Sequence, residues 1–339
     1  MSDLPAQYLF QPRLNQLIVY YDFARPDHYS SFKKKDLTKN FKGQAAYSGD
    51  ISKSGQKKLR RAIETLFVIT PTRRIYNRVI SKMTNFKLSH LTLTLSSVQG
   101  KWTDKEINTF LLRPFLLDCK RKFNLVNYVW KAERQANGNL HYHVISDLFF
   151  DLNLVRKFWN DKQETLGFID QFEQKFKHRN PPSIEITYVR NSDQLAKYVS
   201  KYISKSKTVT RKVQQSLDFQ GCQVEITSDM SEDLIQELQN RNDGRINGRV
   251  WDCSEKLKSF KYQATSLSCK DESAVNDLIS SLNCKRFDSD YFSVITFSDD
   301  TWLKNMPVQL RTTFIDQYQS ILDSDREIFM RKRNNLNIN

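Results

Sequence analysis

Asn139-Leu140-His141-Tyr142-His143-Val144-Ile145 is the stretch around which the rest of the chain is organised. Tyr, Val and Ile favour strands, so this run is predicted to be a β-strand. Side chains alternate between the two faces of a strand, which places His141 and His143 on one face and Tyr142 on the other. Two neighbouring imidazoles on a sheet are suited to metal binding, although two half-exposed polar residues would produce the same pattern.

The composition is that of a globular chain with a strong basic excess. The 339 residues are 39% hydrophobic and carry a formal net charge of +15, and no apolar run is long enough to span a membrane. Residues 1–9 lack the basic start and apolar core of a signal peptide. Five scattered cysteines without CxxC spacing argue against a zinc site and a disulfide framework, and they predict reduced thiols in a cytoplasm.

Basic and acidic residues are concentrated in different parts of the chain. Residues 31–87 hold 15 Lys and Arg against 3 Asp and Glu, whereas residues 222–300 hold 9 against 15. The phosphate backbone of a nucleic acid attracts a segment of the first kind, so the pattern predicts a polyanionic partner. A solvated basic face without a ligand is the alternative.

Hydrophobic periodicity predicts that helices and strands alternate along the chain. Alternating apolar residues predict strands at 91–95, 125–134, 139–145, 183–189 and 291–297. Helical spacing and capping residues predict helices at 55–69, 103–114, 153–163, 193–204, 232–240 and 306–330, with a second basic helix near 72–82. Residues 164–182 form a basic, Phe-rich connection without a clear pattern.

The helix that Thr103 and Glu106 cap carries a specific expectation. Ile107, Phe110 and Leu111 are expected to face inward, and Pro114 is expected to kink or end the helix.

The order of these elements predicts an α+β fold. It is an antiparallel sheet with packed helices, of the split βαβ type with a ferredoxin-like core. We expect this domain at residues 86–206, after a basic and partly helical region at 1–85 and before a smaller accessory region at 207–339.

Glu133 is a candidate third ligand, because hard divalent ions prefer a carboxylate beside imidazoles. A two-residue Asn137-Gly138 turn would pair Glu133 with Tyr142, on the wrong face of the sheet. A three-residue loop pairs it with His141 or His143 instead. We therefore expect a three-residue loop or a bulge with the glycine in a left-handed conformation. A solvent-facing strand carboxylate is the alternative.

The predicted helix at 193–204 repeats residue types at a spacing of four, which places each type on one face. An apolar stripe can dock on the sheet, while phenols and ammonium groups line a neighbouring face. Tyrosine can act as a covalent nucleophile, and a nearby lysine can stabilise charge on a phosphate. An ordinary amphipathic helix would look the same. The candidate catalytic residues are Tyr198, Tyr202, Lys201 and Lys205.

Together these residues resemble the HUH endonucleases, in particular the two-tyrosine rolling-circle replication initiators of single-stranded DNA phages and related plasmids. The resemblance covers residues 88–206, about a third of the chain. Its motifs are the strand at 91–95, the segment from Glu133 to His143, and the segment from Tyr198 to Lys205. The tyrosines follow the histidines, as in the initiators, whereas in conjugative relaxases the tyrosine comes first. Tyr142 departs from the bulky hydrophobic residue that the family usually has between its histidines.

The resemblance implies a metal-dependent enzyme. In the family, Mg²⁺ or Mn²⁺ is held by both histidines and a third polar residue, which here would be His141, His143 and Glu133. A tyrosine attacks the scissile phosphate, leaving a 5′-phosphotyrosine and a free 3′-OH, and the reverse reaction reseals the strand. His90, just before the strand at 91–95, could approach the metal, but we expect it to be a partly exposed polar residue.

The implied partner is single-stranded DNA at a replication origin, in the cytoplasm of a bacterial host for a phage or plasmid protein. A host polymerase would extend the 3′-OH, and because the chain has no GxxxxGK[ST] motif, a host helicase would be recruited. Two alternatives remain open, a single-strand transposase with the same chemistry and a non-catalytic origin-binding or autoregulatory protein.

Overall fold

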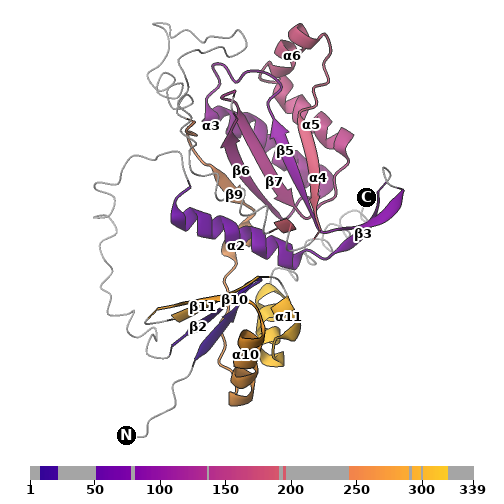
Figure 1. Ribbon diagram of the computed structural model, residues 1–339. Coiled ribbons are helices and arrows are strands. Elements are labelled where there is room, and N and C mark those ends of the chain that lie inside the picture. Colours follow the sequence, from indigo (N-terminus) through magenta and orange to yellow (C-terminus); the bar gives the residue numbers. More distant parts are fainter. Residues whose placement is uncertain are drawn as a thin grey trace, which may run out of the picture. The chain divides into compact units, whose positions relative to one another are not determined.

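The computed structural model describes residues 8–21, 51–77, 81–135, 137–190, 194–195, 244–289, 292–298 and 301–319. The chain divides into two compact units, residues 47–258 and a unit made of residues 1–46 and 259–339 (Figure 1). In the described residues, helices accompany three antiparallel sheets, which confirms the α+β fold. Within the same ranges, no helix is long and apolar enough to cross a membrane.

A five-stranded antiparallel sheet forms the centre of the unit at residues 47–258. The strands that the sequence predicted at 91–95, 125–134, 139–145 and 183–189 are all present in it. The histidine strand lies in the middle of the sheet, so its side chains have neighbours on both sides. The order across the sheet is β8 (Ile184–Val189), β5 (Leu88–Thr94), β7 (Leu140–Ser146), β6 (Tyr128–Arg134) and β9 (Trp251–Cys253).

One face of this sheet is apolar and is covered by helices, which lie behind the sheet in Figure 1. Tyr142 and Leu93 point into this layer and are at most 1% exposed. Phe115 and Trp159 pack edge to face there, with ring centroids 5.4 Å apart. The helices are α3 (Asp104–Ile107), α4 (Arg113–Phe123), α5 (Leu152–Glu164) and α6 (Phe168–Phe176).

Between α3 and α4 the helix continues through a π-helical turn, η3 (Asn108–Leu112). The predicted capping box of Thr103 and Glu106 is confirmed. Two other expectations for this helix are wrong. Pro114 does not end it, because the proline lies in the first turn of α4, where no backbone N–H is needed. Phe110 is 48% exposed, since the wider π turn shifts the positions that face inward.

Helix α2 (Lys53–Ile69) crosses the other face of the sheet, in front of it in Figure 1. The Ser52 hydroxyl caps it by accepting a hydrogen bond from the Gly55 backbone N–H. Leu59, Ile63 and other apolar residues of one stripe are buried, as predicted. The basic residues of the opposite stripe stay in solvent; Lys57, Lys58 and Arg60 are exposed.

Residues 72–82 do not form the basic helix that was predicted. They belong to a two-stranded ribbon of β3 (Arg73–Asn77) and β4 (Lys82–Phe86). Arginine is a good helix former, but Ile75 and Tyr76 favour strands, and no apolar stripe at helical spacing could bury a helix here. In the connecting turn, Ser81 has a φ of +49°.

Two further elements lacked a signal in the sequence. Helix α6 occupies the segment that was interpreted as an unpatterned connection, and it buries Phe168, Ile169 and Phe172. Strand β9 and the short helix α9 (Glu255–Ser259) follow the long segment of residues 196–243, which lies outside the described residues.

The second unit contains a four-stranded antiparallel sheet. The strands are β1 (Leu9–Pro12), β2 (Gln16–Tyr20), β11 (Phe292–Phe297) and β10 (Cys284–Asp288), in that order across the sheet. Its core joins Leu17 of β2 and Ile295 of β11 to Val275 of α10 (Cys269–Ser281) and Trp302 of α11 (Thr301–Asn305).

The later helices and strand of the prediction are partly covered by the described residues. The strand expected at 291–297 is confirmed as β11, and residues 308–319 of the helix expected at 306–330 are helical. The helix expected at 232–240 lies outside the described residues.

Candidate functional site

The turn between β6 and β7 has the odd length that the site requires. Glu133 pairs directly with His141, and the Gln135 backbone N–H donates to the Asn139 carbonyl at 3.0 Å. The loop therefore comprises residues 136–138, and Gly138 adopts a left-handed conformation with a φ of +79°. The register prediction is confirmed, and Glu133 shares a face with both histidines.

A buried polar network holds this loop in place. Arg134 forms an ion pair with Asp104, and it also donates to the Gly138 carbonyl at 3.0 Å. The Gln99 side chain donates to Asp104 at 2.8 Å and accepts from the Leu140 backbone N–H at 3.0 Å. These contacts tie the start of helix α3 to the loop between the two strands, so they fix the register on which the site depends.

The histidine face of the sheet is a continuous polar surface that runs across four strands. Register places on it the side chains that follow each other at every second position. We call this surface the polar face; its members are Thr187 of β8, His90, Thr92 and Thr94 of β5, His141 and His143 of β7, and Lys131 and Glu133 of β6.

His143 lies at the centre of a chain of hydrogen bonds. Its Nε2 atom is 3.2 Å from Glu133 Oε2, and its Nδ1 atom is 3.1 Å from Nε2 of His90. The Nδ1 atom of His90 is in turn 3.1 Å from the Thr187 hydroxyl. The chain therefore links strands β8, β5, β7 and β6 and holds the His143 ring in one orientation.

His90 was expected to be a partly exposed polar residue before the strand, and this is wrong. It belongs to β5 and is only 5% exposed. Its ring stacks on that of His143, with centroids 5.1 Å apart. The alternation at 91–95 extends back to Leu88, so continuing the strand by three residues would have placed His90 on the polar face.

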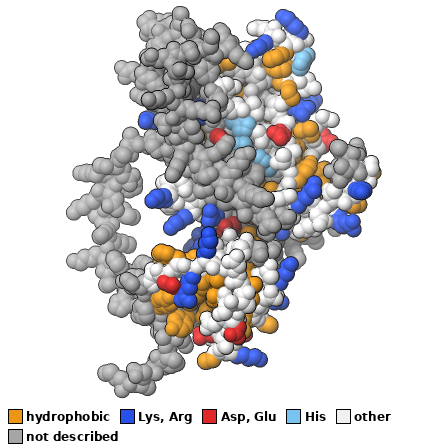
Figure 2. Space-filling model, viewed as in Figure 1, with side chains coloured by type: hydrophobic (Ala, Val, Ile, Leu, Met, Phe, Trp, Pro, Cys, Tyr) orange, Lys and Arg blue, Asp and Glu red, His pale blue; other side chains and the backbone are white. Residues whose placement is uncertain are grey.

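His141 lies beside His143, with ring centroids 4.6 Å apart. Its Nδ1 atom is 3.3 Å from the Thr94 hydroxyl of the neighbouring strand. Histidine side chains reach the molecular surface on this side of the unit, next to acidic ones (Figure 2).

The hydrogen bonds of the three imidazoles agree with one set of tautomers. If every Nδ1 carries the hydrogen, His143 donates to His90, His90 donates to Thr187, and His141 donates to Thr94. The Nε2 lone pair of His143 then faces the Glu133 carboxylate. A lone pair and a carboxylate repel each other, so this contact requires a proton or a cation between them.

The donor set suits a hard divalent ion in chemistry, and in geometry it is two-thirds complete. The 3.2 Å between His143 Nε2 and Glu133 Oε2 is close to the ~3 Å that separates neighbouring ligands of an octahedral ion with bonds of about 2.1 Å. Within the described ranges, however, no three His, Cys, Asp or Glu side chains are grouped so that they could hold a metal ion. Three protein ligands would therefore require the His141 ring to turn toward the pair.

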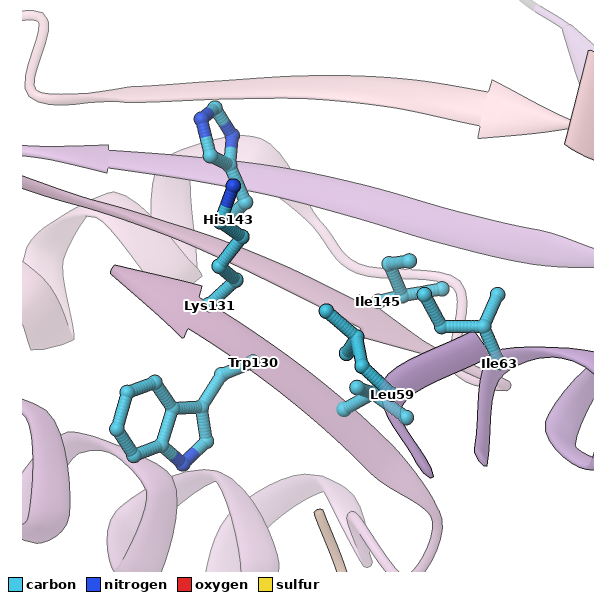
Figure 3. Close-up of a pocket in the computed structure, with 7 residues that line it drawn as sticks. Leu59, Ile63, Trp130, Lys131, His143 and Ile145 are labelled. Carbon is cyan, nitrogen blue, oxygen red and sulfur yellow. The ribbon is translucent and has the colours of Figure 1, made fainter. Parts of the chain in front are cut away.

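Lys131 is a further member of the site that the sequence analysis did not single out. It pairs with His143 across the sheet and is 7% exposed. Figure 3 shows its amine beside the His143 ring, at the edge of a small hollow. Leu59 and Ile63 of α2 line that hollow together with Ile145, so α2 borders the polar face at its Ile145 end.

Tyr142, between the two histidines, is not a candidate nucleophile. Its side chain points to the helical face and is 1% exposed. Burial raises the pKa of its phenol above the ordinary value, and Asp104 contributes in the same direction. A phenol that is buried and hard to ionise cannot reach or attack a phosphate, so Tyr142 has a packing role.

Most of the predicted tyrosine helix lies outside the described residues. This applies to Tyr198, Lys201, Tyr202 and Lys205. Its first described residues, Gln194 and Leu195, are helical. Leu195 is 2% exposed, as expected for the first member of the apolar stripe.

Comparison with protein families gives one match. Residues 89–207 match the model of a family of replication-associated proteins, the ORF2 family. The matched segment contains the polar face with both histidines and Glu133, and it ends just after the tyrosine helix. No curated protein and no solved structure matches the chain significantly. The match supports a replication-associated role of the initiator type for this part of the chain.

Proposed function

We propose that the chain initiates replication by nicking and rejoining single-stranded origin DNA through a phosphotyrosine intermediate, with Mg²⁺ or Mn²⁺ bound at the polar face. The observation that carries the proposal is the Glu133–His143 contact beside His141, on an exposed sheet face inside the segment similar to replication proteins. The oriented imidazoles and the carboxylate are the side chains that would hold the ion.

The ion would polarise the scissile phosphate and offset the negative charge that develops there. His141, His143 and Glu133 would bind it, and the Thr187–His90 pair would keep His143 from rotating. Lys131, buried beside His143, supplies a fixed positive charge at the same place. These residues bind and orient, and none of them is required to form a covalent bond.

The covalent step belongs to the tyrosine helix. The phenolic oxygen of Tyr198 or Tyr202 forms a bond to phosphorus, the bond from phosphorus to the 3′ oxygen breaks, and the phenolic proton ends on that oxygen. A free 3′-OH results, from which a host polymerase would extend. Tyr198 and Tyr202 lie four residues apart and so share a helix face, which allows alternate use. Lys201 and Lys205 would stabilise charge on the phosphate.

The test uses single-stranded oligonucleotides that tile the DNA of the replicon encoding the chain, with Mn²⁺. We expect a covalent adduct on a denaturing gel and, by mass spectrometry, a nucleotide on the peptide that contains Tyr198 and Tyr202. Each Tyr→Phe variant should retain part of the activity, and the double variant should lose it by at least roughly 1,000-fold, since the nucleophile is removed.

Tyr188→Phe is the matched control, because Tyr188 lies on β8 and keeps its ring stacking on Phe149 after the change. Cleavage by the double Tyr→Phe variant would show that the tyrosine mechanism is wrong. A wild-type chain that binds the oligonucleotides in Mn²⁺ but forms neither nick nor adduct would instead be an origin-binding protein.

A further inference from the structure

The ribbon of β3 and β4 exposes an unusual set of side chains on one face. Tyr76 and Met83 are directly paired across the two strands and are 57% and 48% exposed. The next pair on the same face is Arg74 and Asn85, both of which are also exposed. We call these four residues the ribbon face. They offer a ring, a thioether, a guanidinium and an amide side by side to solvent.

The ribbon is anchored at its base, so its free end is held in a defined direction. Arg73 donates to the Asp147 carbonyl and lies over the Phe86 ring, 5.0 Å from the centroid. Phe86 is fully buried and packs edge to face against Phe149 and Tyr188, with centroids 5.5 and 5.6 Å away. These anchors lie on the face of the ribbon opposite to Tyr76. Figure 1 shows the ribbon extending away from the central sheet.

The charge around the ribbon excludes a cationic partner. Residues 65–103 contain six Lys or Arg and no Asp or Glu. Figure 2 shows basic and hydrophobic side chains next to each other at this projection. Two strands with an exposed aromatic pair have little folding stability of their own, so the exposed pair does not stabilise the ribbon. A polyanion with flat apolar rings satisfies both the charge and the exposed ring.

The base of the ribbon is close to the polar face. It is anchored at Asp147, directly after β7, and His143 lies three residues before the end of that strand, about 10 Å away at ~3.3 Å per residue. The ribbon itself adds about 17 Å for its five-residue strands. A nucleic acid strand bound at the site would therefore reach the ribbon face within a few nucleotides.

We propose that the ribbon face binds unpaired DNA next to the cleavage site, with a base stacked on Tyr76 and Met83 and a phosphate held by Arg74. The proposal rests on the proposed function, since it concerns the same DNA. Stacking on an exposed ring requires a base whose face is free, which duplex DNA does not offer. Asn85 can hydrogen-bond to a base edge, which gives the contact some sequence preference.

The experiment measures binding of the full chain to a fluorescein-labelled 20-nucleotide oligo-dT in EDTA, so that no metal and no cleavage are involved. Arg74→Ala with Tyr76→Ala should weaken binding about fivefold to 100-fold, the range of one lost base stack. The slope of log K against log salt should become shallower by about 0.7, as expected for one lost phosphate contact on a single strand. Tyr76→Phe keeps the ring and should remain within twofold of the wild type.

Lys175→Ala with Phe176→Ala on α6 is the matched control, because it removes one positive charge and one ring that is 51% exposed. It should leave oligo-dT binding within twofold. A wild type that fails to bind oligo-dT, a double ribbon variant that binds as the wild type does, or an equal loss on a 20-base-pair duplex would each overturn the proposal. Binding without metal is independent of nicking, so failure of the proposed function would be seen separately.

Discussion

At the residue scale, the orientation of His143 is decided by His90. The imidazole of His90 is buried, stacks on His143, and connects its Nδ1 atom to Thr187. A histidine that binds a metal through Nε2 depends on such a partner at Nδ1, because the partner sets both the tautomer and the ring angle. His90 is therefore a positioning residue for the proposed ligand.

We expect His90→Ala to weaken Mn²⁺ binding about 10- to 100-fold, the usual effect of removing a partner of this kind. The measurement is titration of the purified chain with Mn²⁺, followed by the electron paramagnetic resonance of the free ion. His90→Gln should restore much of the affinity, because its side-chain amide oxygen can accept from His143 near the position of the lost Nε2. His178→Ala, an exposed histidine, is the control. Unchanged affinity in His90→Ala would remove the positioning role.

At the scale of elements, the loop between β6 and β7 depends on one buried ion pair. The side chains of Arg134 and Asp104 are 5% and 1% exposed. Arg134→Ala leaves the Asp104 carboxylate buried without its cation, and breaking such a pair costs about 3–5 kcal/mol in the free energy of unfolding. The measurement is urea denaturation followed by circular dichroism at pH 7.

Arg179→Ala provides a matched comparison for this loss. Arg179 forms ion pairs with Glu164, Asp170 and Glu173, but its side chain is 43% exposed. Solvent screens such pairs, so we expect a loss of no more than about 1 kcal/mol. Similar losses in both variants would mean that burial of the Arg134–Asp104 pair contributes nothing.

The sequence predicted those elements whose side chains repeat with a clear period. The strands at 91–95 and 139–145, the helix at 55–69 and the odd loop before His141 all follow from local alternation and turn chemistry. The ribbon at 73–86 was misread because its helix-favouring arginines outnumber its strand formers. The π turn before Pro114 and helix α6 have no local pattern that distinguishes them, and the network of Gln99, Asp104 and Arg134 exists only once distant segments meet.

At the scale of the whole molecule, each unit has its own core, and the cysteines report on them separately. Cys119 and Cys253 are buried in the unit at residues 47–258, and burial raises the pKa of each thiol to about 12. Only the thiolate reacts with alkylating agents, so at pH 8 about one in 10,000 of these thiols is reactive even before access is considered. Cys269, in the other unit, is exposed.

We therefore expect iodoacetamide at pH 8 to modify Cys269 in the native chain, and Cys119 and Cys253 only after denaturant unfolds their unit. Reactivity of the two buried thiols should rise at high pH, as their pKa of about 12 is approached. Mass spectrometry of the digested protein gives the extent at each site, and a fully denatured sample is the control. Rapid native modification of Cys253 would contradict its burial.

The sequence could not predict the sheet of the other unit, because its central pairing is between segments at opposite ends of the chain. Tyr20 of β2 pairs with Phe292 of β11. Each strand shows some alternation, but nothing in either one identifies the other.

That pairing has a consequence for how the protein is made. About 270 residues separate the two partners, and ribosomes add roughly 5–20 residues per second, so β2 waits on the order of 15–55 seconds before β11 is synthesised. During that interval the whole of residues 47–258 emerges and can fold, while the β1–β2 hairpin carries an unpaired edge that can attach to other nascent chains. Slower translation of the segment before residue 292 should therefore increase aggregation and leave the fold of the completed chain unchanged.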